Sequence, residues 1–200
     1  MNRRFKMVLG GCVIAGASSL LTTQVMSQPD AGDDPMAEWM EFAQPGEVHQ
    51  EMAKSVGQWK QEYIRWEAPG APGVKTAGTS TMTTLLGGRF LQERTTSKFN
   101  IEGQEMVMDG MGIFGFNRMT SRHEFVWMDS FGTMMMFGTG EADESGKVIT
   151  YLTEMTGPDG STIDMKMVTN MKDDNHHVVD MYIQTPDGGW FKTMQIDSTR

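Results

Sequence analysis

The chain has 200 residues, of which 38% are hydrophobic and 22% charged, and its formal net charge is −9. A chain of this length can form one domain with a substantial apolar core. The excess of acidic residues argues against nucleic acid and anionic membrane surfaces as partners, because both require concentrated Lys and Arg.

Residues 1–27 predict a signal peptide. Three basic residues within the first six precede a stretch of apolar and small residues at 7–21, and Val25 and Ser27 stand at positions −3 and −1 of a signal-peptidase site. The stretch is too short and too rich in Gly, Ala and Ser to span a bilayer stably. We therefore expect a periplasmic or secreted protein with no transmembrane segment after cleavage. Loss of the three basic residues changes the net charge from −9 to −12.

A lipid anchor is the minor alternative for the same leader. Leu9-Gly10-Gly11-Cys12 resembles a lipoprotein cleavage box, in which Cys12 would be acylated and retained. The apolar run before Cys12 covers only residues 7–9, short of the roughly seven residues that an apolar leader region needs. If Cys12 leaves with the leader, no cysteine remains, and disulfides, thiol nucleophiles and thiolate metal sites are excluded.

The next segments predict a tether and then one or two short helices. Residues 28–35 are polar, acidic and contain Gly and Pro, which is typical of a flexible tether. Residues 36–43 and 47–55 carry apolar side chains at helical spacing, and Pro45-Gly46 separates them. A single domain is expected over residues 36–200.

From Gly57 to the C-terminus the pattern is that of β-strands. Turn sequences recur about every 8–14 residues, and the segments between them alternate, as in the inward set His177, Val179, Met181 and Ile183. About ten such segments and no amphipathic helix predict an all-β fold. Consecutive hairpins favour an antiparallel up-and-down barrel, because closure removes the exposed edges of a long meander.

Seven segments of this region occur in a characteristic order: Pro45–His49, Gly57-Gln58-Trp59, Leu86–Phe90, Gly110–Asn117, Trp127–Thr133, Phe191–Ile196 and Thr199-Arg200. In that order they resemble the bacterial family catalogued as domain of unknown function 1579, over residues 42–200. The resemblance implies a lipocalin-like (calycin-type) barrel, in which Gly-x-Trp opens the first strand and a late arginine, here Arg200, packs on Trp59. The family has no established activity, so it implies no catalytic residue. The chain departs from its pattern in its Met content and in Phe116, where Tyr is common.

The histidines give no metal motif. His176 and His177 are neighbours on one strand and point to opposite faces, and neither His-x-His nor His-x-x-x-His occurs. His177 shares its face with apolar residues, which leaves heme ligation by a lone pocket histidine as an alternative. No cofactor is the main expectation.

Methionine is unusually frequent, with 21 residues in the chain. Met106/Met108, Met134/Met136 and Met165/Met167 are same-face pairs at strand spacing. Capture of Cu(I) by thioethers is one alternative. Because the pairs are scattered, we prefer a flexible apolar lining that fits a ligand or an irregular core.

The preferred hypothesis is a protein that binds or carries a small apolar or amphipathic molecule inside the barrel, since barrels of this size leave room for one small ligand. A hydrolase or isomerase using Asp129, His123 and His177 in the same cavity, and a structural envelope protein with a filled barrel, are the alternatives. An enzyme is the less favoured of these classes, and no catalytic residue is assigned. The expected ligand-binding residues are Trp127, Met134, Met136, Met165, Met167, His177, Met181 and Tyr182. Strand alternation places Met181 and Tyr182 on opposite faces, so one of these two must be wrong.

Overall fold

The computed structural model describes residues 35–101 and 103–200. The predicted signal peptide, the alternative lipid anchor at Cys12 and residues 28–34 of the predicted tether lie outside the described residues. Within the described part of the chain, no helix has the length and apolar character needed to cross a membrane.

Two short helices precede the strands, as predicted: α1 (Pro35–Phe42) and α2 (Glu47–Ala53). Pro35, expected to end the tether, is instead the first residue of α1, a position that tolerates proline because its backbone nitrogen needs no hydrogen-bond partner there. At the start of α2, the backbone N–H of Gly46 donates to Nδ1 of His49 at 3.1 Å. This bond fixes the imidazole of His49, which is buried.

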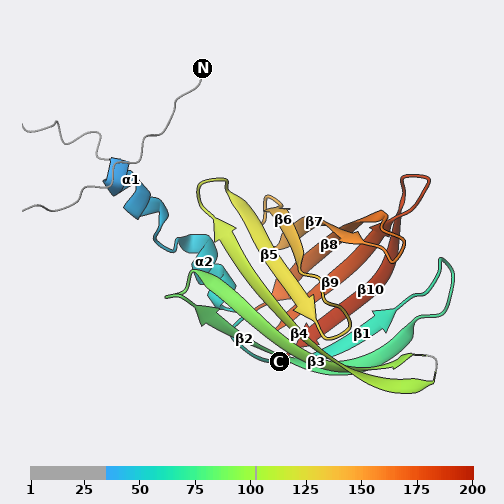
Figure 1. The fold of residues 1–200 in the computed structure, drawn as a ribbon. Helices are drawn as coiled ribbons and strands as arrows, with labels where there is room; N and C mark the ends of the chain where they lie inside the picture. The colour runs from blue at the N-terminus through green and yellow to red at the C-terminus, as the bar shows by residue number, and fades with distance from the viewer. Residues whose placement is uncertain (1–34, 102) are drawn as a thin grey trace, which may run out of the picture. The chain divides into compact units, whose positions relative to one another are not determined.

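Ten antiparallel strands follow in chain order (Figure 1). They are β1 (Gly57–Arg65), β2 (Val74–Leu85), β3 (Phe90–Ile101), β4 (Gln104–Asn117), β5 (Arg122–Asp129), β6 (Met136–Ala142), β7 (Val148–Thr156), β8 (Thr162–Asp173), β9 (His176–Gln184) and β10 (Trp190–Thr199). Each strand pairs with its neighbour in sequence, and β1 pairs with β10, from Lys60↔Thr199 to Arg65↔Met194. The predicted up-and-down barrel of about ten strands is thereby confirmed.

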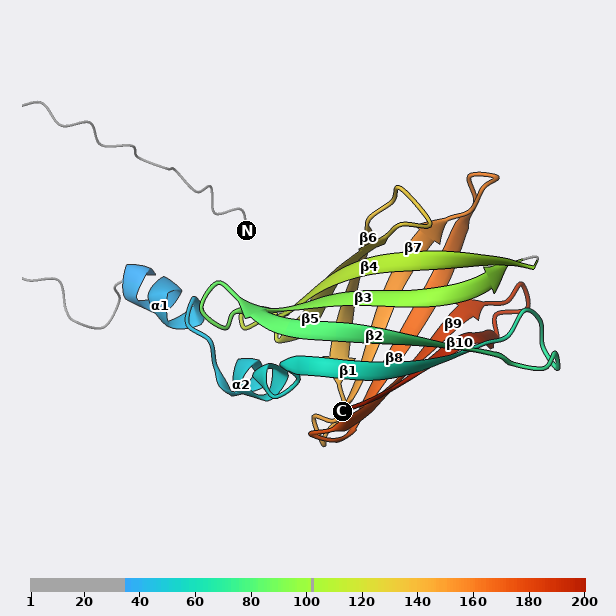
Figure 2. The ribbon, with the colours of Figure 1, turned by 90° about the horizontal axis from the view of Figure 1, so that it is seen from below.

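Figure 2 shows α2 beside the start of β1, at one end of the barrel. Trp59, Met82 and Leu91 form a buried cluster, and Met52 of α2 and Phe114 pack against it. The indole Nε1–H of Trp59 donates to the carbonyl of Ser55 at 2.9 Å, which ties β1 to the end of α2. This end of the barrel is therefore held by both apolar packing and a buried hydrogen bond.

Arg200 completes the same end of the molecule. Its guanidinium carbon lies 4.6 Å from the centre of the Trp59 ring, as the family resemblance implies. It also donates to the backbone carbonyls of Val56 at 2.7 Å, Lys54 at 2.9 Å and Asp174 at 2.6 Å. One side chain thus joins the last strand to α2 and to the β8–β9 turn.

Candidate functional site

The barrel encloses a cavity of about 970 Å³. Its lining comes from inward-facing residues of the strands and extends to α2 and to the turns at residues 145–147 and 173–174. The lining therefore reaches exposed residues at the α2 end as well as Phe99, Met108 and Asp129 near the opposite end of the barrel. A space of this volume falls within the range that proteins use for small organic ligands.

Most of the wall is apolar and polarisable. Phe99, Phe114, Phe125 and Tyr151 contribute aromatic surface, and Phe125 meets Tyr151 edge-on with ring centres 5.2 Å apart. Thioethers supply much of the remainder: the lining methionines are Met52, Met82, Met108, Met136, Met165, Met167, Met171, Met181 and Met194. Unbranched methionine side chains adapt to a ligand of irregular shape.

Trp127 is positioned by the glycines of the neighbouring strand. A Cβ atom added to Gly110 of β4 would lie 2.5 Å from Cζ2 of the Trp127 ring, so only glycine leaves room for it. The indole Nε1–H of Trp127 donates to Oδ2 of Asp129 at 2.9 Å. The ring is therefore fixed on the cavity wall by close packing and by one hydrogen bond.

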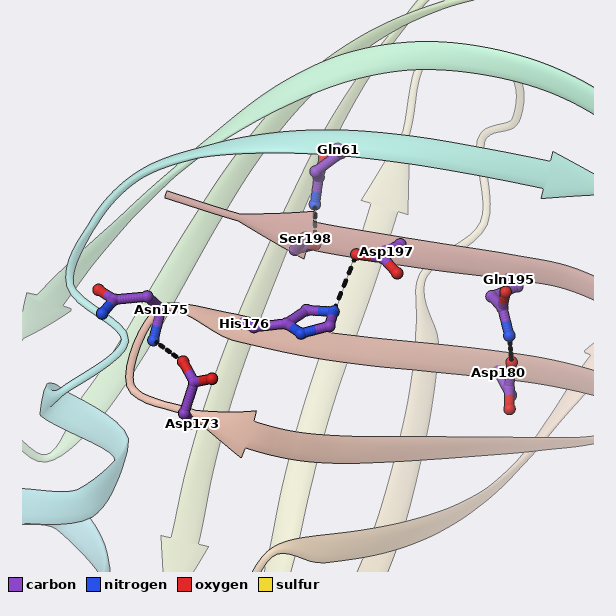
Figure 3. Close-up of polar contacts among 8 residues, drawn as sticks. All are labelled: Gln61, Asp173, Asn175, His176, Asp180, Gln195, Asp197 and Ser198. Atoms are coloured by element: carbon purple, nitrogen blue, oxygen red, sulfur yellow. Dashed lines mark hydrogen bonds and ion pairs between the residues drawn. The ribbon is translucent and has the colours of Figure 1, made fainter.

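A polar cluster formed by inward side chains of β1, β3 and β10 interrupts this apolar wall, and its members from β1 and β3 meet across β2. Gln61, Tyr63 and Thr95 are buried, and the hydroxyls of Tyr63 and Thr95 each lie 2.7 Å from Oε1 of Gln61, to which they donate. The amide nitrogen of Gln61 then donates to Oε1 of Glu93 at 3.1 Å. It also donates to the hydroxyl of Ser198 at 3.4 Å, a contact drawn in Figure 3. Glu93 lines the cavity at the end of this network.

The electrostatics of the cluster follow from its burial. Removal from water raises the pKa of the Glu93 carboxyl, and the adjacent side chains of Ser80 and Gln61 oppose that rise. Burial also raises the pKa of the Tyr63 hydroxyl. Among the described residues, the hydroxyl of Ser80 finds no partner in hydrogen-bonding geometry. The cluster therefore retains unused hydrogen-bonding capacity.

Two buried histidines face the same cavity. His123 and His177 are each only 5% exposed, and Nδ1 of each lacks a hydrogen-bond partner within the described residues. Burial is the main cause that lowers both pKa values, that of His177 to about 4. Both rings are consequently neutral at physiological pH.

The residues proposed for acid–base catalysis do not form a reacting pair. No carboxylate lies within hydrogen-bonding distance of His123 or His177 in the residues that the structure describes. Asp129 accepts hydrogen bonds from Trp127 and from the backbone N–H of Phe131 in its turn. Across the described ranges, no group of three or more His, Cys, Asp or Glu side chains is arranged to hold a metal ion.

Six of the expected ligand-binding residues line the cavity: Trp127, Met136, Met165, Met167, His177 and Met181. Met134 does not, because β6 begins only at Met136 and Met134 is exposed in the preceding loop. Tyr182 also does not, because it alternates outward and lies under the ammonium of Lys166, 4.8 Å from the ring centre. Whether the six lining residues bind a ligand stays a prediction.

The polar cluster is not among the residues predicted from the sequence. A signal for it exists, since Gln61 and Tyr63 follow Trp59 at intervals of two on β1, and Glu93 and Thr95 do the same after Leu91 on β3. Polar residues at inward positions of two neighbouring strands indicate a buried network, because such side chains must find partners.

A second hollow of about 720 Å³ lies on the outer face of β5–β8. Phe137 and Leu152, which are 65% and 58% exposed, form its apolar part, and its carboxylates Glu124, Glu154 and Asp164 are all exposed to solvent. It contains no buried titratable group among the described residues. We therefore place the candidate site inside the barrel.

Comparison with solved structures finds proteins that are similar to this chain. The crystal structure of Rv2717c from M. tuberculosis is similar, with a TM-score of 0.55 and 12% sequence identity over 78% of this chain and 99% of that one. The S-type phycobiliprotein lyase CPES from Guillardia theta aligns with a TM-score of 0.49 and 11% identity over 82% of this chain and 96% of that one. No curated protein matches the sequence.

The family assignment comes from the sequence itself. The model of the family described as "Protein of unknown function (DUF1579)" matches residues 44–200, which include α2 and all ten strands. The lipocalin-like barrel and the contact between Arg200 and Trp59 are what the resemblance to this family implied. The chain belongs to the DUF1579 family.

Proposed function

We propose that this protein is an exported carrier that holds one small amphipathic molecule inside its barrel. The observation that carries the proposal is the cavity of about 970 Å³, whose wall is mainly apolar but contains one hydrogen-bonded polar cluster. An apolar wall favours binding by excluding water, and a few convergent polar groups orient the ligand. The predicted leader at residues 1–27 would deliver the carrier out of the cytoplasm.

Binding of a neutral apolar dye tests this function. The full chain is expressed in a Gram-negative host and purified from the periplasm, where its mass reports the cleavage site predicted after Ser27. Nile red is then expected to bind with 1:1 stoichiometry and a blue-shifted emission. In Met167→Trp the added ring occupies the cavity, and the affinity falls about tenfold or more.

Val168→Trp is the matched control, because residue 168 pairs with Asp180 and faces outward next to Met167. It should bind the dye as the wild type does. Absence of dye binding in the wild type, or an equal loss in both variants, would contradict a ligand site in the barrel interior. Thermal melts of both variants establish that the comparison is made between folded proteins.

A further inference from the structure

We propose that the ligand carries an amine, and that its ammonium group is bound by the carboxylate of Glu93 while its apolar body lies against the cavity wall. This inference rests on the proposed carrier function and adds the chemical class of the ligand. It comes from the direction of the hydrogen bonds around Glu93 and from the distribution of charge along the cavity.

The hydrogen bonds around Gln61 present Glu93 as an acceptor. Two hydroxyls, those of Tyr63 and Thr95, lie 2.7 Å from Oε1 of Gln61 and donate to it. The amide nitrogen must then face Glu93, and it donates to Oε1 of the carboxyl at 3.1 Å. The Gln61 amide therefore supplies the carboxyl of Glu93 with a donor, while it also donates to the hydroxyl of Ser198 at 3.4 Å, and the carboxyl is left able to accept further hydrogen bonds from the cavity side.

Glu93 lacks a cationic partner. It forms no ion pair within the described residues, and no arginine lines the cavity. Lys166 contributes to the wall, but its ammonium lies outside the barrel against Tyr182 and Trp190. Arg65, which alternates inward at the opposite end of β1, is paired with Glu67 at 3.3 Å and lies outside the lining.

A carboxyl in this position gains most from a cation that arrives with the ligand. Burial without a counter-charge raises the pKa of Glu93, and a bound ammonium would favour the ionised form again. A buried charge is tolerated in a protein when it is paired and hydrogen-bonded. Gln61 provides the hydrogen bond to Glu93, and the ammonium group of the ligand would provide the opposite charge.

The rest of the cavity suits a cation better than an anion. His123 and His177 are neutral, so neither supplies positive charge for a carboxylate or phosphate ligand. Aromatic rings and thioethers line the wall, and aromatic faces attract organic cations. An anionic ligand would meet Glu93 without any arginine to neutralise it.

Acidic side chains also outnumber basic ones at the α2 end of the cavity. Glu47 and Glu51 of α2 and Asp173 and Asp174 of the β8–β9 turn line it, against two lysines, Lys54 and Lys147. Lys54 is already paired with Glu51 at 2.7 Å. The excess of acidic over basic side chains here attracts cations more than anions, so this end of the cavity and its interior favour the same class of molecule.

Three ligands of equal chain length test the inference: octylamine, octanol and octanoate, titrated by calorimetry at pH 7.5 below the concentrations at which they aggregate. The wild type should bind octylammonium about tenfold or more tightly than octanol, and octanoate most weakly. In Glu93→Gln, which keeps the shape of the side chain and removes the charge, the affinities for the amine and the alcohol should become equal to within about twofold. Octanol should bind this variant as it binds the wild type.

Glu62→Gln is the control, since Glu62 follows Gln61 on β1, is exposed and pairs with Lys75 on the outer wall at 2.8 Å. It changes the net charge equally and should keep the preference for the amine. Equal binding of amine and alcohol by the wild type, or a preference that survives in Glu93→Gln, would overturn the inference while Nile red binding still supports a carrier. If neither Nile red nor any of the three ligands binds, the carrier function fails and the amine site fails with it.

Discussion

The imidazole of His177 lies against Trp59, with the two ring centres 4.6 Å apart and the rings at 69°. Its outer neighbours on the strand face solvent, whereas its own ring is buried and its Nδ1 is unpartnered among the described residues. Burial disfavours the charged form, and the nearby charges of His176 and Arg200 act in the same direction against the opposing effect of Asp197. The ring therefore resists protonation until the pH falls to about 4.

The free energy of unfolding should consequently decrease in acid. Above pH 6.5 His177 is neutral in both the folded and the unfolded chain and contributes no pH dependence. Between pH 6.5 and about 4 the unfolded chain binds the proton and the folded chain does not, so stability falls as the pH falls. The loss from this residue is about 2 kcal/mol at pH 5 and about 3 kcal/mol below pH 4.

Urea unfolding at pH 7 and pH 5 measures this loss in the wild type and in His177→Leu. The variant should lose about 2 kcal/mol less than the wild type over that interval. Met181→Leu, an inward substitution on the same strand without a titratable group, should keep the wild-type difference. An unchanged difference in His177→Leu would mean that the acid sensitivity arises elsewhere, for example at His49 and His123, whose pKa values are also lowered by burial.

For individual residues, the sequence predicts which side chains face the barrel interior but not which other side chains they contact there. Met165 and Met167 were identified because alternation alone decides the face of a strand residue. The role of Glu93 depends on Gln61, 32 residues away and on another strand. Such a contact follows from the register of β1, β2 and β3, which local periodicity does not contain.

Among the elements, the C-terminal end of β10 is held mainly by one side chain. Arg200 is exposed, yet its guanidinium makes hydrogen bonds to four partners and stacks on Trp59. Exposure reduces the value of each contact, because water competes for the same groups. The planar fork nevertheless allows one residue to bind several carbonyls at once, which a lysine does not.

Arg200→Ala should therefore lower the free energy of unfolding by about 2 kcal/mol, and Arg200→Lys should restore less than half of the loss. Arg122→Ala is the comparison, because Arg122 is half-exposed and forms a single ion pair with Glu141 at 2.7 Å. Its loss should stay below about 0.5 kcal/mol. Equal effects of the two alanine variants in urea unfolding would show that Arg200 contributes no more than an ordinary surface charge.

The boundaries of the elements were predictable where a turn sequence marks them and less so elsewhere. Pro45-Gly46 separates the two helices, and Gly57 opens β1, as expected. Met134 and Met136 were expected on the same strand, but only Met136 lies in β6, because the loop after Asp129 continues to residue 135. In β10, a register shift between Lys192 and Met194 interrupts the alternation, and the sequence around it contains no glycine or proline that would announce a bulge.

For the molecule as a whole, closure joins residues that are far apart in the chain. The pairing of β1 with β10 leaves no free sheet edge among the described strands. Breaking any one pair would expose two edges and open the cavity to water at the same time. Separating any two neighbouring strands is therefore unfavourable in free energy. A partly formed barrel, which has free edges and no enclosed cavity, gains little stability.

We expect the barrel to unfold as one cooperative unit. In urea, tryptophan fluorescence and far-UV circular dichroism should report the same midpoint and the same slope. Both midpoints should move together in Arg200→Ala. A fluorescence transition that precedes the loss of strand signal would instead indicate a barrel that opens before it unfolds, because Trp59 lies on β1 next to the β1–β10 pairing.

The methionine thioethers that let the cavity wall adapt to a ligand also make that wall sensitive to oxidation. Air or peroxide converts a methionine to its sulfoxide, which places a strongly polar oxygen on a flexible apolar side chain. Met165 and Met167 lie on the same face of β8, and Met181 pairs with Met167. Oxidation of these few residues would therefore replace an apolar part of the cavity wall with a polar, hydrated one. An aged preparation and a fresh one then have chemically different cavities. Peptide masses recorded before a binding titration show whether the protein in use is oxidised.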